Sequence, residues 1–389
     1  MFGDSPASLV SNRDSNPGNT RCLSQAADWV LDADRGRAVL RRQQERKLRV
    51  LAVIGAVAAF ALAALRAFAG DYEDGVRFRE SKDFARALTS FGKAAAQGNA
   101  AAQALLGLMY AEGEGVTRDY VRALSWYEKA AVLGNAVAQY NLGLMYAGGQ
   151  GVARDFRLAA LWHEKAALQG YAQGQSYLGY MYYNGQGVAQ NYQQALHWCA
   201  AAAAQGNAPA QYNLGLMYAK GQGVTQDQRL AASWYMKAAV QGNAIAQYSL
   251  GLMYANGDGI PHDHRLAVSW YEKAAAQGFV LAQNNLALMY DNGDGVTRDA
   301  RLAVLWYEKA AAQGDEIAQY NLGLMYAKGQ GVAKNYPEAH KWWSLAEANG
   351  DRSARKNRQT VEKLMTPEQI AESQRKVSAW ISARGQPAR

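Results

Sequence analysis

Two Ser-x-x-Lys patterns offer the first residues that could perform chemistry: Ser90 with Lys93, and Ser353 with Lys356. A serine nucleophile with a lysine base needs this spacing at a helix start, together with further Ser-Asp-Asn and Lys-Thr-Gly motifs. Neither motif follows here. We therefore interpret both patterns as chance, and the sequence contains no visible set of nucleophile, base and orienting group.

The histidines suggest one candidate metal site, for which the sequence signal is weak. His262 and His264 flank Asp263 and follow Asp258, a set of side chains that could ligate a metal ion. Their segment, GDGIPHDHR, has the composition of an exposed joint, so a solvated loop is the preferred interpretation. The Gly-x-Gly joints lack the lysine and the preceding strand of a phosphate-binding loop. We predict no metal and no cofactor.

The two cysteines, Cys22 and Cys199, do not form the paired pattern of a disulfide framework. Cys199 occupies a helix position that other copies fill with Tyr127, His163 or Tyr235. We expect a buried structural thiol rather than a reactive one. With no catalytic set in view, the sequence predicts a protein that is not an enzyme.

A repeat of 36 residues positions Cys199, His262 and His264, and it runs without insertion from about residue 99 to residue 350. Each copy contains two helix-like runs joined by a Gly-x-Gly segment. Ala138, Leu142 and Met145 have the spacing of one helix face, and the methionine is expected to fill the core. The repeat therefore predicts an all-α solenoid. Its tryptophan recurs at Trp126, Trp162, Trp198, Trp234, Trp270, Trp306 and Trp342.

The net charge of +8 does not indicate a nucleic-acid partner. Residues 71–350 contain 22 Lys and Arg against 23 Asp and Glu, a net charge of −1. The positive excess lies in the flanks, whereas nucleic-acid binding needs a basic face on the folded body. We predict no nucleic-acid partner.

The N-terminal part predicts export. Residues 1–49 are polar and then basic, and we expect them to be disordered. Residues 50–65 lack charged side chains but are short for a membrane span, which needs about 20 residues. Within 50–69 we expect either a signal peptide cut near Ala67 and Ala69, or an uncleaved membrane anchor. The repeats would then be periplasmic or secreted, or tethered to the membrane outside the cytoplasm.

The expected domain layout follows. Residues 71–350 form the repeat domain, a shorter opening cap unit at 71–98 followed by seven full repeats. Residues 351–389 are expected to contain a basic linker and a C-terminal capping helix. Thr366 and Gln369 have the spacing of a capping box, which marks the start of that helix.

The motifs A-x-A-Q-Y-N-L-G-L-M-Y, G-x-G-V and A-x-x-W-Y-x-K-A-A-x-x-G resemble the Sel1-like repeat family, a relative of the tetratricopeptide repeat. The resemblance covers about residues 75–350. It implies antiparallel helix pairs, a right-handed superhelix, a concave groove and a scaffold or adaptor role, often in bacterial envelopes or signalling. Cysteine-rich members are linked to penicillin binding and β-lactam hydrolysis. An envelope hydrolase is thus the alternative, but the paired cysteines of that subgroup are missing here.

The groove is the remaining candidate site. If first helices line it, as in tetratricopeptide arrays, rigid tyrosines and amide side chains would recognise a protein or peptide. The alternative is that the tyrosines only pack between neighbouring repeats. We expect a monomer. The predicted partner-binding residues are Tyr140, Asn141, Tyr180, Tyr183, Tyr212, Asn213, Tyr248, Asn285, Tyr320 and Asn321.

Overall fold

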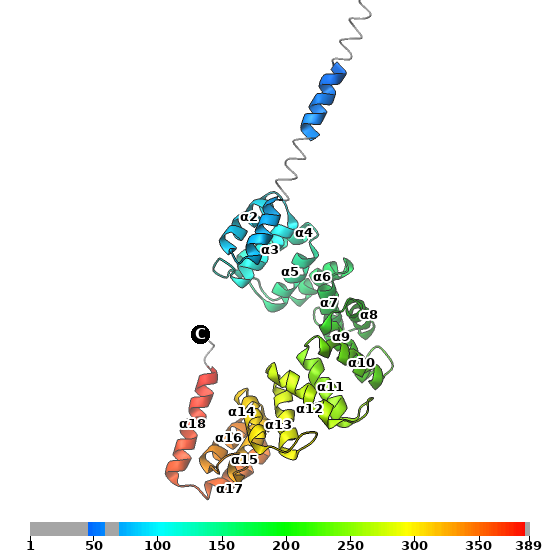
Figure 1. Cartoon of the computed structure of the whole chain (residues 1–389). Helices are drawn as coiled ribbons and strands as arrows, with labels where there is room; N and C mark the ends of the chain where they lie inside the picture. The colour runs from blue at the N-terminus through cyan, green and yellow to red at the C-terminus, as the bar shows by residue number, and fades with distance from the viewer. Residues whose placement is uncertain (1–45, 59–69, 386–389) are drawn as a thin grey trace, which may run out of the picture. The chain divides into compact units, whose positions relative to one another are not determined.

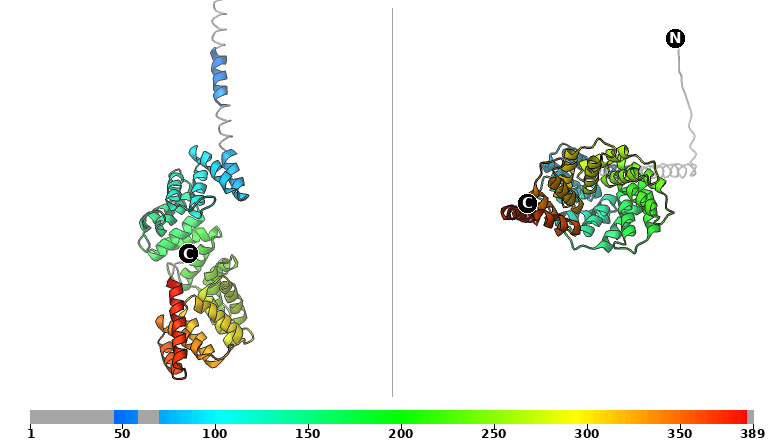
Figure 2. Two further views of the ribbon diagram at one scale, coloured as in Figure 1. Left: turned by 90° about the vertical axis from the view of Figure 1, so that its left-hand side faces the viewer. Right: turned by 90° about the horizontal axis from the view of Figure 1, so that it is seen from below.

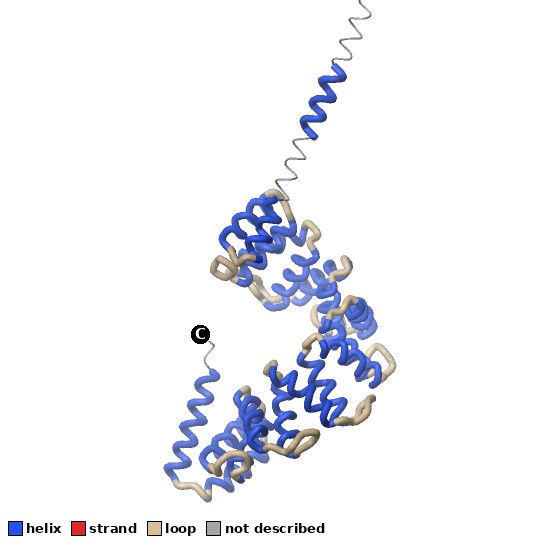
Figure 3. Tube along the Cα trace, in the orientation of Figure 1, coloured by secondary structure: helices blue, strands red, loops and turns tan. Residues whose placement is uncertain are grey.

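The computed structural model of the chain describes residues 46–58 and 70–385. Helices are the only regular elements in these two ranges, and they contain no strand (Figure 3). The chain divides into two compact units, Met1–Gln97 and Gly98–Arg389. The predicted all-α solenoid is confirmed.

The first unit contains a helix hairpin in its described part. A helix over residues 70–80 is followed by α2 (Phe84–Ala96), whose N-cap Asp83 accepts a hydrogen bond from Arg86 N. Phe91 is fully buried, and a β-carbon on Gly75 would lie 2.5 Å from its ring. Gly75 is therefore the position at which the two helices approach most closely.

Residues 46–58 form a further helix with exposed apolar side chains such as Val50 and Ile54. Over the ranges 46–58 and 70–385, none of the helices has both the length and the apolar character needed to cross a membrane. Ala67 and Ala69, the predicted cleavage region, lie outside the described residues. The signal peptide or anchor therefore stays a prediction.

The second unit is a stack of seven helix pairs followed by two further helices (Figures 1 and 2). Every helix of the seven pairs has 13 residues. The first helices are α3 (Ala100–Glu112), α5 (Ala136–Gly148), α7 (Ala172–Asn184), α9 (Ala208–Lys220), α11 (Ala244–Asn256), α13 (Val280–Asn292) and α15 (Glu316–Lys328). The second helices are α4 (Tyr120–Val132), α6 (Phe156–Leu168), α8 (Tyr192–Ala204), α10 (Gln228–Val240), α12 (His264–Ala276), α14 (Ala300–Ala312) and α16 (Tyr336–Ala348).

Local signals set the helix ends. In α5 the N-cap Asn135 accepts a hydrogen bond from Ala138 N at 2.9 Å, and the helix ends at Gly149 in the left-handed conformation. Two first helices lack a side-chain cap, because Tyr171 and Phe279 occupy the N-cap positions of α7 and α13. Loss of such a cap typically costs about 1 kcal/mol.

Close packing within five of the seven pairs depends on a glycine facing an aromatic ring; in the third repeat Gly179 faces the Cys199 sulfur, and in the sixth Ala287 replaces the glycine. A β-carbon on Gly251 would lie 2.6 Å from the Tyr271 ring, so any side chain here would force the helices apart. In the second repeat the facing ring is His163, and it would lie 2.7 Å from a β-carbon on Gly143. Met145 is buried, as predicted for core filler.

A row of buried glutamines joins successive repeats. Gln211 donates from Nε2 to Ala203 O at 3.3 Å, and its Oε1 accepts a hydrogen bond from Gln241 Nε2 at 2.7 Å. The same pattern recurs at each later junction, the last using Asn349. Because each amide is satisfied on both sides, the row fixes the register of neighbouring repeats. The buried members are Gln139, Gln175, Gln211, Gln247, Gln283 and Gln319.

The C-terminal segment differs from the sequence prediction. The expected basic linker is a helix, α17 (Arg352–Glu362), because Asp351 caps it and Ala354 and Val361 pack into the core. Two of its basic side chains, Arg355 and Arg358, pair with Glu347 of the last repeat. The predicted capping box is present: Thr366 and Gln369 exchange hydrogen bonds at 3.0 and 3.3 Å, and α18 (Pro367–Gly385) follows.

Candidate protein-interaction surface

The candidate surface, called the first-helix surface here, consists of the exposed and half-buried residues of the first helices. In Figure 1, α7 and α9 lie on the inner side of the curve that their repeats follow, and α8 and α10 lie on the outer side. All ten predicted partner-binding residues belong to first helices. Tyr180 is exposed and the other nine are half-buried.

The tyrosines of the predicted groove also pack inward. Tyr212 stacks on the buried Tyr235, with ring centroids 5.6 Å apart and an interplanar angle of 29°. Tyr248 contacts the buried Tyr271 at 5.9 Å and Phe279 at 5.2 Å. Each ring therefore has one face on the core and leaves part of its surface to solvent. The packing that the sequence offered as the alternative role is therefore present, and recognition of a partner by these residues stays a prediction.

Two of the predicted partner-binding asparagines, Asn141 and Asn285, are engaged within the chain. Asn285 Nδ2 donates to the buried Tyr271 hydroxyl at 3.4 Å. Asn141 Nδ2 donates to Val137 O, one turn back in its own helix, at 3.0 Å. These amides therefore satisfy internal acceptors, and only their remaining hydrogen-bonding capacity is free for a partner.

Tyr183 is held by a polar chain between two repeats. Its hydroxyl donates to Gln222 Oε1, and Gln222 Nε2 donates to the Tyr192 hydroxyl at 3.1 Å. The Tyr183 and Tyr192 rings also meet edge to face, with centroids 5.5 Å apart. This tyrosine is fixed by neighbours on both sides. Tyr320, in the last repeat, accepts a hydrogen bond on its hydroxyl from Asn357 Nδ2 of α17 at 3.3 Å.

Four tyrosines gather on the second and third repeats in what we call the tyrosine cluster: Tyr140, Tyr171, Tyr177 and Tyr180. The Tyr140 ring meets Tyr171 at 5.6 Å and Tyr177 at 6.5 Å, both edge to face, and Tyr177 meets Tyr180 at 5.8 Å. Burial is the main cause that raises the pKa of Tyr140, Tyr171 and Tyr177. Their hydroxyls therefore stay protonated at neutral pH and can donate hydrogen bonds.

His163 lies beneath this cluster. Its ring is 4.3 Å from the Tyr177 ring and 5.4 Å from the Tyr140 ring, and the residue is fully buried. Neither ring nitrogen has a hydrogen-bond partner. Burial without a counter-charge lowers the pKa of His163 to about 3. His163 is therefore a neutral core residue.

Charge is distributed unequally between the two helices of a repeat. The seven first helices contain five charged residues, all in the first or last two positions of a helix. The second helices hold more charge, and Lys165 on α6 lies 3.9 Å from the Trp162 ring centroid. Apolar side chains are exposed near the start of several first helices: Val137, Ile245, Leu281 and Ile317.

The sequence-predicted chemical groups do not form a reactive site. Cys199 is buried, as predicted, and burial raises the pKa of its thiol to about 12, so it is protonated at neutral pH. The rings of His262 and His264 meet edge to face, with centroids 4.2 Å apart. Among the described residues, no three His, Cys, Asp or Glu side chains are grouped so as to hold a metal ion.

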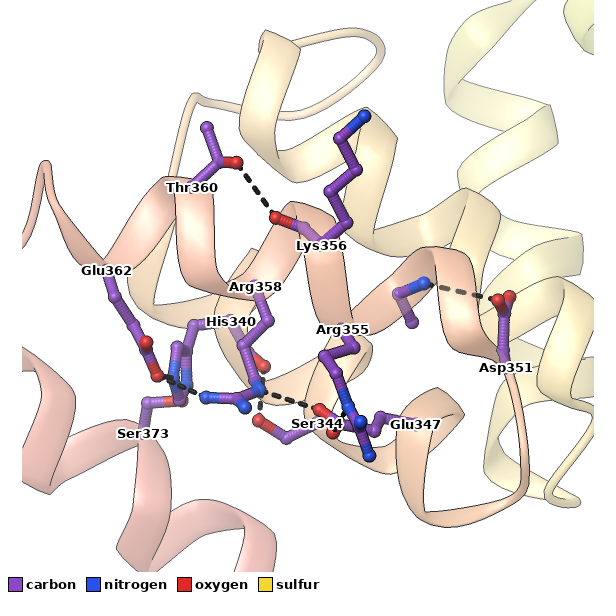
Figure 4. A network of polar contacts seen from close by, with 11 residues as sticks. His340, Ser344, Glu347, Asp351, Arg355, Lys356, Arg358, Thr360, Glu362 and Ser373 are labelled. Atoms are coloured by element: carbon purple, nitrogen blue, oxygen red, sulfur yellow. Dashed lines mark hydrogen bonds and ion pairs between the residues drawn. The ribbon is translucent and has the colours of Figure 1, made fainter.

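A serine, a histidine and a glutamate do meet at the C-terminal end, which the sequence did not reveal. His340 Nδ1 lies 2.9 Å from Ser373 Oγ, and His340 Nε2 lies 2.8 Å from Glu362 Oε1 (Figure 4). This residue set is that of a hydrolase triad. However, Ser373 has no exposed surface and His340 has 1%. A substrate could not reach this serine, and the set instead ties α16, α17 and α18 together.

Two arginines of α17 extend this network. Arg355 and Arg358 donate to opposite oxygens of Glu347, at 2.6 and 2.8 Å, and Arg358 also pairs with Glu362 (Figure 4). These arginines hold the pKa of the Glu347 carboxyl below its usual range, against an opposing effect of burial. The network anchors the terminal helices to the last repeat.

The stacked helix pairs define an α-solenoid. The chain belongs to the Sel1 repeat family, which matches residues 100–135, 136–171, 172–207, 208–243, 244–279, 280–315 and 317–351.

Two solved structures illustrate the relationship. A protective antigen of uropathogenic Escherichia coli with an SLR fold is 34% identical, with a TM-score of 0.50, and the match covers 84% of this chain and 82% of that one. A Sel1 repeat protein from Oxalobacter formigenes is 35% identical, with a TM-score of 0.59, over 62% of this chain and 96% of that one. No curated protein matches the chain.

Proposed function

We propose that this chain is a non-catalytic scaffold whose first-helix surface binds an uncharged, largely apolar segment of a protein partner. The observation that carries the proposal is the near absence of charge on the seven first helices, apart from their ends. Sel1 repeat proteins as a family serve as interaction scaffolds, which supports this interpretation.

The chemistry of the surface fits such a partner. Half-buried tyrosines such as Tyr212 and Tyr248 are already oriented by stacking, so little side-chain entropy is lost when a partner covers them. Exposed Ile245 and Leu281 lie near the starts of α11 and α13 and can bury further apolar area. Binding should therefore depend little on salt and should show a negative heat-capacity change.

The test is affinity capture from an envelope extract with the full chain and the double variant Tyr212→Ala, Tyr248→Ala. Alanine is compatible with the fold at this position, because Ala104 occupies it in the first repeat. We expect the variant to lose partners that the wild-type chain retains. The function would be wrong if capture persisted while the variant remained folded.

We also propose that the apolar run at residues 50–65 directs the repeats out of the cytoplasm, either as a cleaved signal or as an anchor. The support is its sequence alone, a basic flank before an uncharged stretch and Ala67 and Ala69 after it. N-terminal sequencing of the exported chain tests the choice. A start near residue 70 indicates cleavage, an intact N-terminus in the membrane fraction indicates an anchor, and an intact chain in the cytosol refutes export.

A further inference from the structure

We propose that the tyrosine cluster, Tyr140, Tyr171, Tyr177 and Tyr180, is a subsite for a proline-rich segment in the extended polyproline II conformation. The inference rests on the proposed function, because it takes the first-helix surface as the binding surface. It adds the class of ligand and the place where that ligand is recognised.

The cluster arises from departures that one repeat makes from the others. Tyr171 stands where five other repeats have a capping Asn or Asp, and α7 consequently lacks a side-chain cap. Such a local loss is expected where a residue serves binding instead of folding. Tyr180 replaces a leucine that is present at Leu108, Leu144, Leu216, Leu252, Leu288 and Leu324.

The spacing of the rings suits an extended ligand. Successive centroids are 5.6, 6.5 and 5.8 Å apart. Polyproline II rises about 3.1 Å per residue, so alternate residues lie about 6.2 Å apart and can contact successive rings. Because the rings touch one another, they enclose no space for a small cation, which an aromatic cage would require.

The polar groups of the cluster match the same ligand. Neither α5 nor α7 carries a charged residue, so a charged ligand would find no counter-charge on either helix. The hydroxyls of Tyr140, Tyr171 and Tyr177 are protonated at neutral pH, as tyrosine hydroxyls ordinarily are, and burial raises their pKa further. A proline-rich segment has few backbone N–H groups but many free carbonyl oxygens, and phenol hydroxyls can donate to them. Aromatic surfaces of this kind recognise proline-rich segments in other folds.

The test uses fluorescein-labelled decaproline and fluorescence anisotropy with the full chain. The key variant, Tyr171→Asn with Tyr180→Leu, installs the residues that other repeats use, so it should fold at least as well as the wild type. Phe279→Asn is the matched control, because it restores the same kind of cap in α13, outside the cluster. A labelled Gly-Ser decapeptide controls for nonspecific binding.

We expect wild-type chain and Phe279→Asn to bind decaproline equally, with an affinity that is unchanged between 50 and 500 mM salt. The double variant should bind at least tenfold more weakly.

The proposal is overturned if wild-type chain does not bind decaproline, if the double variant binds as well, or if an apolar helical peptide of equal length competes better for the cluster. Partner capture that depends on Tyr212 and Tyr248, without decaproline binding, would refute this subsite and leave the proposed function intact. If decaproline binds through the cluster but the Tyr212→Ala, Tyr248→Ala variant still captures partners, the proposed binding role of the wider first-helix surface would be refuted instead.

Discussion

His163 should make the repeat core sensitive to acid. The folded chain holds this side chain neutral, since burial lowers its pKa to about 3, whereas the unfolded chain binds a proton near the ordinary value of 6.5. Between these pH values the unfolded state binds more protons. Stability is therefore complete above pH 6.5 and is lost as the pH falls towards 3.

The size of the effect follows from the shift. Each pH unit below 6.5 corresponds to about 1.4 kcal/mol, so roughly 3 kcal/mol should be lost at pH 4.5. No carboxylate or other acceptor offsets this cost, because both ring nitrogens lack a partner and the rings of Tyr140 and Tyr177 cover the imidazole.

The matched variant is His163→Tyr, because Tyr127, Tyr235, Tyr271 and Tyr307 fill the equivalent position in other repeats. Urea unfolding of both proteins at pH 7.5 and pH 4.5 gives the test. Carboxylates that titrate elsewhere affect both proteins equally and cancel in the difference. We expect the wild type to lose roughly 3 kcal/mol more than the variant. An equal loss in the two proteins would refute the reasoning.

Three further predictions concern the fold and the absence of catalysis. Gln211→Ala should cost about 1–3 kcal/mol in urea unfolding, because it removes the two hydrogen bonds that Gln211 makes with Ala203 and Gln241; the exposed Gln226→Ala should cost little, and equal effects would contradict the proposed role of the glutamine row. Tyr171→Asn should add a helix cap and stabilise the chain by about 1 kcal/mol, and a lower melting temperature would show that the ring contributes more than a cap. The purified chain should not hydrolyse a chromogenic β-lactam, and Ser373→Ala should lower the melting temperature only; hydrolysis that disappears in this variant would show that the buried serine is reactive.

Much of the fold could be predicted because small residues recur at fixed positions of the repeat. Glycine at positions such as Gly251, together with the neighbouring alanines, lets the two helices of a repeat approach closely. Because the repeat length is constant, the same helix contact recurs in successive repeats. The same sequence could not identify which ring fills the contact. His163 rather than Trp162 faces Gly143, because one turn of helix brings several positions close to the seam and side-chain packing selects among them.

The C-terminal end shows where sequence patterns fail. The charged run after residue 350 has the composition of a linker, but it is helical, and Arg355 and Arg358 pair with Glu347. This pairing depends on how α17 packs against the end of α16, which composition alone does not show. The meeting of Ser373 with His340 was unpredictable for the same reason. For the candidate surface, the positions of the tyrosines were predictable from periodicity, while their stacking on buried rings was not.

The measurement that tests the central claim most directly is partner capture by three forms of the full chain. These are the wild type, Tyr212→Ala with Tyr248→Ala on first helices, and Leu302→Ser with Leu305→Ser among the exposed residues of α14. All three are first checked for equal helicity. We predict that the wild type and the α14 variant retain the same partner, that capture survives 500 mM salt, and that the tyrosine variant loses it. Retention by the tyrosine variant, or loss confined to the α14 variant, would contradict binding at the first-helix surface.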